Sequence, residues 1–593
     1  MTADEVRYND VSRMVMPGPF RAAECKLNMS FGVANTSTES LLQNLERHCT
    51  ERPDATFCHF WSGDIREDIS FRQLKGRSGA YANLYRESGL RAGNVVLIML
   101  KHSPDMYYAF IGAMLCGCIP SMMPFPSVKQ DPVKYWESHK QLFERIGAGA
   151  IVTYSENTKV LSDRLHGRRL RVLVPEDLAE KSYPFEAVQA RLEDVALIQH
   201  SSGTTGLKKG VQLSYGAVAG QIMSYAATLG LTTSDCFASW LPLYHDMGLI
   251  ACFIMPLALG LPVVSLDAFE WVSRPEILFD AIQAHGCTHV WLPNFAFHHL
   301  CRTVDSELYR LDSVKAFIDC SEPCRAETFD LFHETFAGSG VASDRLHCCY
   351  AMAETVFAVT QTALGEETRE YAVDANTLAN HHRAIPAVYG KPSRRVLSVG
   401  RVIPGLEIDI IGADGSALPA DHAGEIVVRG EFLFSGYYKN DAETAKSFFR
   451  EWYRTGDTGF VHDGELYILG RLKELIIVYG KNLYATDLEY ICNRAVGVKR
   501  GRCVVFGVFN PDLGSEDVVV VAETEIPAGP EWATIRKNIK LELLAGVGIP
   551  PHDIRIVEPG WLVKSTSGKI ARGENLSKYL ADKTSRKGCP DPA

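Results

Sequence analysis

Helical and strand-like hydrophobic patterns follow one another over the first part of the chain. Apolar residues recur at helical spacing over 71–85 and 133–146, whereas 95–100 and 150–154 are nearly continuous apolar runs. Continuous runs between amphipathic helices are typical of parallel strands buried on both faces. The pattern predicts βαβ units, and therefore an α/β fold class with layered sheets in a large N-terminal domain.

From about residue 396 the pattern changes to short strands separated by turn residues. Asp463-Gly464 lies between the alternating segments 458–462 and 465–469. This arrangement predicts a β-hairpin with a type I′ turn, in which both central residues adopt positive φ. The region is therefore expected to form a β-rich subdomain.

The chain beyond Arg471 has the pattern of a small α+β domain. Its expected elements are strands at 504–509, 518–521 and 554–557, and a helix at 531–544. The predicted domains are therefore 1–470 and 471–593, and the last ten residues are expected to form a frayed tail.

Composition narrows the classes of protein to consider. A chain of 593 residues with 46% hydrophobic and 22% charged residues is expected to be globular, with at least two domains. The net charge is −10 and no long Lys/Arg run is present, so nucleic acid is not expected as a partner. The 16 cysteines include no CxxC pair, which favours buried free thiols in a cytoplasmic protein over a zinc site.

One uncharged stretch, 247–266, is long enough to cross a membrane. Pro256 and Pro262 interrupt it, however, so a buried helix followed by a buried strand at 261–266 is predicted instead. No integral membrane segment is therefore expected. The N-terminus, MTADEVRYND, is charged and lacks the apolar region of a secretory signal.

The densest chemical signal is the run HSSGTTGLKKG at 200–210, between a predicted strand at 195–198 and a helix beginning near Ser214. A glycine-rich nest of backbone N–H groups with neighbouring hydroxyls binds phosphate oxygens, and Lys209 adds a positive charge. A Walker A loop is excluded, because Lys208 stands where that motif needs glycine. The predicted phosphate-binding residues are Ser201, Ser202, Gly203, Thr204, Thr205 and Gly206.

Further motifs follow in a fixed order. They are CSEP at 320–323, YAMAE at 350–354, RTGD at 454–457, GRLKE at 470–474 and STSGKI at 565–570. In this order, and with the loop at 200–210, they resemble the motifs of the adenylate-forming superfamily. That superfamily contains acyl-CoA synthetases, peptide-synthetase adenylation domains, luciferases and fatty acyl-AMP ligases. The loop departs at Lys208, where the family usually has proline.

The resemblance implies ATP and Mg²⁺ as cofactors and assigns a role to each motif. Glu354 would bind the metal, and hard cations do prefer oxygen ligands. Asp457 would bind the ribose hydroxyls, with Arg471 beside them, and Lys473 would be the hinge of a mobile small domain. The implied catalytic residues are Lys569, Glu354 and Lys209. The implied adenine-side contacts are Ser321, Glu322, Tyr350, Met352 and Ala353.

The implied reaction joins a carboxylic acid to AMP with release of pyrophosphate and then transfers the acyl group to a thiol. Because the acid and ATP are both anionic, a positioned lysine is needed where charge develops. An apolar acid pocket is expected from the aromatic residues and the apolar segment after Gly248. The candidate substrate contacts are His245, Asn294, Phe295 and Cys320. Aromatic residues at these positions could equally belong to the core, and His245 could be structural.

Three segments, 242–249, 293–297 and 479–489, resemble fatty acyl-AMP ligases in particular. The long separation of Glu354 from Arg401 also resembles the insertion of that branch, here about 364–394. This resemblance implies a fatty acid as substrate and an acyl carrier protein as acceptor. Two alternatives remain at this point: an acyl- or aryl-CoA ligase that uses coenzyme A, and a non-catalytic adenylate-binding protein.

Overall fold

The computed structural model describes most of the chain. The described residues are 40–126, 135–136, 139, 142–143, 145–164, 170–178, 185–201, 209–478, 481–510, 515–564 and 569–586. Outside them lie much of the predicted helix 133–146, positions 202–208 of the phosphate loop, and most of the predicted tail. Ser202, Gly203, Thr204, Thr205 and Gly206 are therefore not placed.

The largest sheet has nine strands in the order β17-β14-β13-β12-β11-β9-β10-β1-β2. The six strands from β13 to β1 are parallel, whereas β14, β17 and β2 pair antiparallel at the two edges. Almost every residue of the parallel strands is buried, which explains their continuous apolar runs. The strands are β1 Thr56–Ser62, β2 Ile65–Ser70, β9 Phe237–Ser239, β10 Val263–Leu266, β11 His289–Leu292, β12 Ala316–Cys320, β13 Leu346–Ala351, β14 Ala358–Gln361 and β17 Arg401–Val402.

Two smaller sheets complete the first half of the chain. The predicted strands 95–100 and 150–154 are confirmed as β3 and β5, at the centre of a parallel sheet β4-β3-β5-β6. The strand before the phosphate loop, β7, pairs antiparallel with β8, which the sequence analysis did not predict. The bounds are β3 Val95–Met99, β4 Ile119–Met122, β5 Ala150–Thr153, β6 Arg171–Leu173, β7 Val195–Ser201, β8 Lys209–Ser214 and β20 Gly436–Tyr437.

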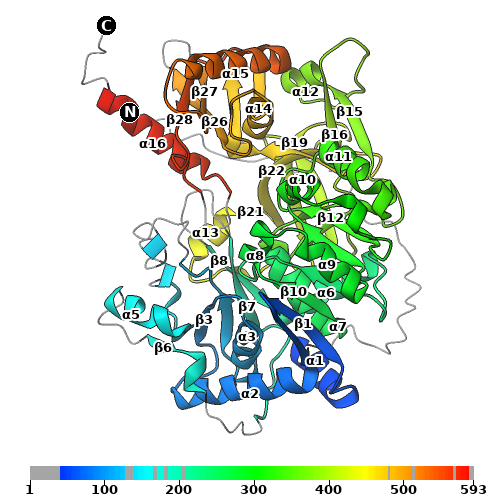
Figure 1. Cartoon of the computed structure of the whole chain (residues 1–593), viewed down its shortest axis with the longest axis vertical. Helices are drawn as coiled ribbons and strands as arrows, with labels where there is room; N and C mark the ends of the chain where they lie inside the picture. The colour runs from blue at the N-terminus through cyan, green and yellow to red at the C-terminus, as the bar shows by residue number, and fades with distance from the viewer. Residues whose placement is uncertain are drawn as a thin grey trace.

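Helices surround these sheets (Figure 1). The predicted helix 71–85 is confirmed as α2, and its N-cap Ser70 accepts a hydrogen bond from the Gln73 backbone N–H. The uncharged stretch 247–266 forms a buried π-helix Met247–Ile254, then α7, then strand β10, as predicted. The helices are α1 Leu41–Glu51, α2 Phe71–Glu87, α3 Asp105–Leu115, α5 Ser155–Arg164, α6 Tyr215–Thr228, α7 Met255–Leu259, α8 Ala268–Ser273, α9 Ile277–His285, α10 Asn294–Thr303, α11 Ala326–Phe336, α12 Ala375–His381 and α13 Asp441–Lys446.

The β-rich region contains the predicted hairpin. β22 and β23 pair antiparallel, and the turn residues Asp463 and Gly464 have φ of 49° and 77°, as a type I′ turn requires. A separate antiparallel pair, β15-β16, begins within the predicted insertion and ends just beyond it, at Leu397. The bounds are β15 Glu370–Asp374, β16 Ser393–Leu397, β18 Leu406–Ile411, β19 Gly424–Gly430, β21 Phe448–Phe449, β22 Trp452–His462 and β23 Glu465–Arg471.

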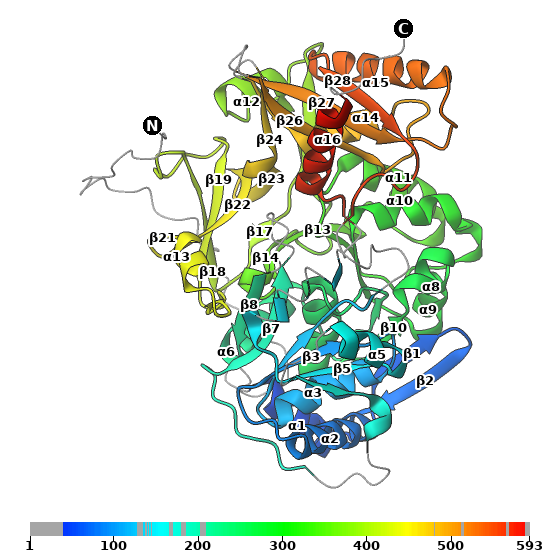
Figure 2. The same cartoon turned by 90° about the vertical axis from the view of Figure 1, so that its left-hand side faces the viewer.

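The C-terminal part lies at one end of the molecule, opposite α1 and α2 (Figures 1 and 2). One of its hydrophobic clusters consists only of residues between Ile476 and Ile556. The predicted α+β elements are present, and α16 is an addition that the sequence analysis did not predict. The elements are β24 Leu475–Val478, β25 Lys481–Tyr484, α14 Ala485–Cys492, β26 Cys503–Asn510, β27 Ser515–Glu523, α15 Glu531–Val547, β28 Asp553–Val557 and α16 Arg572–Arg586.

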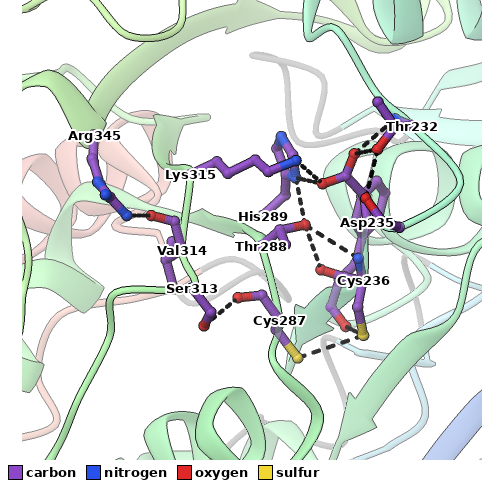
Figure 3. A network of polar contacts seen from close by, with 12 residues as sticks. Thr232, Asp235, Cys236, Cys287, Thr288, His289, Ser313, Val314, Lys315 and Arg345 are labelled. Atoms are coloured by element: carbon purple, nitrogen blue, oxygen red, sulfur yellow. Dashed lines mark hydrogen bonds and ion pairs between the residues drawn. The ribbon is translucent and has the colours of Figure 1, made fainter.

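A polar network around the buried side chains of Asp235 and His289 joins the amino ends of β9, β11 and β12 (Figure 3). The Lys315 Nζ donates to Asp235 Oδ1 at 2.8 Å, and His289 Nδ1 lies 3.7 Å from the same oxygen. Burial pushes the pKa of Asp235 up, but the hydrogen bonds from Lys315 and the Thr232 backbone outweigh it and lower that pKa. Burial lowers the pKa of His289 to about 4. The network therefore links β9, β11 and β12 at their amino ends, on the edge of the sheet opposite the candidate site.

Within the described ranges, no helix is both long and apolar enough to span a bilayer.

Candidate active site

Most of the motif residues predicted to be functional lie where the parallel strands of the main sheet end. Ser321 follows β12 directly, Tyr350 is the second-last residue of β13, and Asn294 comes soon after β11. Because the carboxyl ends of parallel strands share one edge of a sheet, these residues are brought together from distant parts of the sequence. The site is therefore assembled at that edge.

Tyr350, Asp457 and Arg471 form a contiguous polar cluster. The Tyr350 hydroxyl donates to Asp457 Oδ2 at 2.7 Å, and Arg471 Nε lies 3.2 Å from Asp457 Oδ1. Asp457 and Arg471 are direct partners in the β22–β23 pairing. Burial raises the pKa of Asp457, although Arg471 and Tyr350 oppose the shift. Three motifs predicted to contact adenosine thus meet in one place.

Lys569, in the C-terminal part, reaches the same edge of the sheet. Its Nζ donates to the backbone carbonyl of Ser321 at 2.6 Å. Ser321 has φ of 71°, a left-handed conformation that is uncommon for a residue with a side chain and is often found at functional sites. The contact brings the proposed catalytic lysine next to the strand end at which Tyr350 also lies.

Glu354 is buried beside Tyr437 and Lys209. The Tyr437 hydroxyl donates to Glu354 Oε1 at 2.9 Å, and Lys209 Nζ lies 4.6 Å from the centre of the Tyr437 ring. Lys209 also forms an ion pair with Glu443. Burial raises the pKa of Glu354, while the Tyr437 hydroxyl and Lys209 act to lower it. Val356 follows with φ of 67°, a strained value for a β-branched residue.

The donor set around Glu354 fits a hard cation. No described residue donates a hydrogen bond to Glu354 Oε2, which leaves one carboxylate oxygen available. Carboxylate oxygens are ligands that Mg²⁺ prefers, and such sites usually add phosphate oxygens and water. No cluster of three His, Cys, Asp or Glu side chains suited to a metal occurs among the described residues.

The predicted contacts at the ends of β11 and β12 differ in their burial and in their hydrogen bonds. Asn294 Nδ2 donates to the buried Asp319 at 2.6 Å, and Glu322 accepts the backbone N–H of Phe295 at 3.0 Å. Cys320 is fully buried, whereas Phe295 is 47% exposed. Asn294 and Glu322 thus support the loops of the site.

Two adenine-side candidates lie immediately before Glu354. Ala353 is buried, and the Met352 backbone N–H donates to the Phe357 carbonyl at 2.9 Å. The neighbouring Ala351, the last residue of β13, does not have a positive φ.

An apolar pocket lies in the large N-terminal part, among the segments that follow β3, β4, β9 and β10. The empty volume among its walls is about 570 Å³, including the part that is open to solvent. Its apolar walls include Met106, Met122, Met123, Phe125, Trp240 and Leu243. His245 lines a smaller adjoining hollow together with His200, and the two spaces share Met122, Leu243 and Tyr244.

Sequence reasoning missed most of these pocket residues. They come from β4 and the segment after it, from α3, and from the loop after β9. No local pattern distinguishes such residues from ordinary core, because only the packing of the sheets leaves space between them. Of the predicted substrate contacts, only His245 lines either space.

The C-terminal part contacts the large part through a small set of polar groups. The Asp487 carboxylate forms ion pairs with Arg325, at 3.3 Å, and with Arg394, at 3.0 Å. Asn482 Nδ2 lies 3.3 Å from His382 Nε2, which comes from the predicted insertion. Lys473, the predicted hinge, is exposed in a short 3₁₀ helix, Leu472–Glu474.

Comparison with known proteins identifies the class. A family model described as AMP-binding enzyme matches residues 45–438, so the chain belongs to the AMP-binding enzyme family. The chain is an adenylate-forming ligase of this family, and the resemblance noted in the sequence is confirmed.

Two relatives and one structure are similar over nearly the whole chain. The long-chain-fatty-acid–AMP ligase FadD32 of Mycolicibacterium smegmatis is 28% identical, over 91% of this chain and 94% of its own. The medium-chain-fatty-acid–[acyl-carrier-protein] ligase JamA of Moorena producens is 27% identical, over 91% and 94%. A structure from a study of fatty acyl-adenylate ligases of E. coli and L. pneumophila has a TM-score of 0.85 at 23% identity, over 93% of this chain and 99% of that one. This last similarity confirms the fold class.

Proposed function

We propose that the protein activates a fatty acid as its acyl-AMP and transfers the acyl group to the phosphopantetheine thiol of an acyl carrier protein. The observation that carries the proposal is the meeting of Tyr350, Asp457, Arg471, Ser321 and Lys569 at one edge of the main sheet. The apolar pocket beside this edge supports a substrate with an apolar chain.

In the first half-reaction, a carboxylate oxygen of the acid attacks the α-phosphorus of ATP. A new P–O bond forms, the bond to the bridging oxygen of the β-phosphate breaks, and pyrophosphate leaves. Lys569 is positioned to neutralise the charge that develops on the attacking and phosphoryl oxygens. Asp457 offers two acceptor oxygens to the ribose hydroxyls, and Tyr350 and Arg471 hold this carboxylate in place.

In the second half-reaction, the thiol sulfur attacks the acyl carbon. The bond from that carbon to the AMP oxygen breaks, AMP leaves, and the thiol proton is released to solvent. We propose that residues 1–470 and 471–593 act as two domains and that the second rotates about Lys473 between the half-reactions. The separate hydrophobic cluster of the C-terminal part supports this division.

The acceptor is proposed from two lines of support. JamA, which is named for transfer to an acyl carrier protein, is similar over nearly the whole chain. The insertion contributes His382 and Arg394 to contacts with the C-terminal part, which would favour one domain arrangement. Coenzyme A remains the alternative acceptor. A cytoplasmic location is also proposed, since all cysteines in the described part of the chain are free thiols.

The decisive test is ATP–pyrophosphate exchange measured over a panel of carboxylic acids. Exchange that depends on a fatty acid is expected. A protein that binds ATP but supports no exchange with any acid would instead be a non-catalytic adenylate-binding protein.

Activity is expected to require Mg²⁺, and Glu354→Gln is expected to raise the Mg²⁺ concentration needed for half-maximal exchange. Glu354 would hold the ion, which when bound offsets the negative charge of the phosphate oxygens. The neutral amide oxygen of glutamine is a weaker ligand. The control is Glu407→Gln, since Glu407 pairs with Arg429 on the β-rich sheet. An identical Mg²⁺ titration for wild type and Glu354→Gln would remove Glu354 from this role.

A further inference from the structure

Apart from Ser265, whose hydroxyl accepts a hydrogen bond from Tyr107, the apolar pocket contains three polar side chains that its apolar walls do not explain. Tyr244, Asp267 and His102 all line it, on segments that follow β9, β10 and β3. A saturated hydrocarbon chain that covered such groups would remove water from them without offering a hydrogen bond in return. Their hydrogen bonds therefore show what kind of group they could bind.

Each of the three side chains keeps an unused hydrogen-bonding atom. Asp267 Oδ1 accepts the backbone N–H groups of Phe269 at 2.7 Å and Glu270 at 2.8 Å, whereas Oδ2 receives no donor from the described residues. His102 Nε2 lies 3.1 Å from the Trp61 carbonyl. A carbonyl can only accept, so Nε2 carries the proton and Nδ1 is left as an acceptor.

The Tyr244 hydroxyl has no hydrogen-bond partner in the part of the chain that the structure describes. Burial, with a contribution from Asp267, raises its pKa to about 12, so it stays protonated at neutral pH. Burial lowers the pKa of His102, although Asp267 and Glu270 oppose the shift. The pocket thus presents a carboxylate acceptor, an imidazole acceptor, and a hydroxyl that can donate or accept.

These groups lie on the path that an acyl chain would follow. The pocket shares Tyr244, Leu243 and Met122 with the smaller hollow that His245 and His200 line. His200 lies directly before the predicted phosphate loop. A chain whose carboxylate is at the reacting end would therefore pass Tyr244 before it reaches the apolar walls.

We propose that the acid activated by this protein carries a hydrogen-bond donor, a hydroxyl or amino group, on its otherwise apolar chain, and that Tyr244 and Asp267 select for it. The inference rests on the proposed function and adds a substrate class to it. Two of these three unused atoms can only accept, which favours a group that donates. The Trp240 Nε1–H of the same pocket, which has no partner among the described residues, can donate to the oxygen of a hydroxyl. A hydroxyl would donate to Asp267 and accept from Tyr244. An amino group would also be attracted by the negative charge of Asp267.

The test compares a straight-chain fatty acid with its positional hydroxy and amino derivatives of the same length. Binding is measured by calorimetry and activation by pyrophosphate exchange, both with the full-length protein. At least one derivative is expected to exceed the parent acid about tenfold in affinity and in kcat/KM, which is the effect of one additional hydrogen bond to a charged group. Comparison of the two series distinguishes a hydroxyl from an amino group.

Two conservative variants test the named residues. Tyr244→Phe removes only the hydroxyl, and Asp267→Asn removes the charge while keeping a good N-cap for α8. Both are expected to lower severalfold the ratio of kcat/KM for the derivative to kcat/KM for the parent acid. Tyr389→Phe is the control, because Tyr389 is fully exposed.

The outcomes separate this inference from the proposed function. Preference for the parent acid in both binding and exchange would overturn the inference and leave the proposed function standing. An equal loss for parent and derivative in Tyr244→Phe and Asp267→Asn would also overturn it. Absence of exchange with every acid would overturn the proposed function, and the binding preference would still decide the inference.

Discussion

Lys569→Ala is expected to lower the rate of acyl-AMP formation by about 10²–10³, while ATP still binds. Lys569 Nζ already lies 2.6 Å from the Ser321 carbonyl at the carboxyl edge of the main sheet. The step joins two anions, so removal of this ammonium group leaves part of their repulsion uncompensated. The adenosine contacts proposed for Tyr350 and Asp457 do not involve Lys569, and nucleotide binding is therefore expected to survive.

The measurement is ATP–pyrophosphate exchange together with equilibrium binding of ATP. Lys540→Ala is a matched control, because Lys540 is an exposed lysine of the same C-terminal part. Unchanged exchange in Lys569→Ala would show that another group neutralises the charge. Loss of ATP binding in that variant would point to a role in nucleotide affinity.

The second prediction concerns the thiol acceptor. The intact protein is expected to load a pantetheinylated carrier protein efficiently and to form little acyl-CoA. A segment that binds the C-terminal part stabilises one domain arrangement, and each 1.4 kcal/mol of such bias shifts the populations about tenfold. A carrier protein can offset the bias through its own contacts, whereas coenzyme A offers fewer. Removing the segment 364–394 should therefore raise acyl-CoA formation more than acyl-AMP formation.

The structure shows that point variants suit this experiment better than a deletion. Val373, Leu378 and Ala384 of the segment fill a hydrophobic cluster with Phe460 and Tyr467, so a deletion would also damage the core. Point variants at His382 and Arg394 avoid this damage, since both contact the C-terminal part through polar atoms at its surface.

Arg394→Ala and His382→Ala, combined, are expected to raise the rate with coenzyme A severalfold, because the partly exposed Arg394–Asp487 ion pair and the His382–Asn482 hydrogen bond contribute about 1 kcal/mol or less each. Arg395→Ala is the matched control: this adjacent arginine pairs with Glu370 and Asp330, both in the large part. Efficient acyl-CoA production by the wild-type protein would contradict the prediction and favour a CoA ligase.

The hydrophobic pattern predicted individual elements well where a period is strong or a turn is specific. Strands 95–100 and 150–154 were recognisable because both faces of a parallel strand are buried. The Asp463-Gly464 turn was recognisable because few residue pairs tolerate two positive φ angles. β8 and α16 were missed. β8 directly follows the phosphate loop, and α16 is largely polar along its length.

The sequence by itself determined the class of protein and pointed to the motifs proposed as catalytic, because nucleotide chemistry needs particular residues at short, local spacings. Only the tertiary structure decided which groups meet. It joins Tyr350 to Asp457, brings Lys569 to Ser321, and turns Asn294 toward Asp319. The pocket with Tyr244, Asp267 and His102 also arises only from packing, since its walls come from segments far apart in the chain. Local patterns report the periodicity of single elements, whereas the space left between packed elements depends on all of them at once.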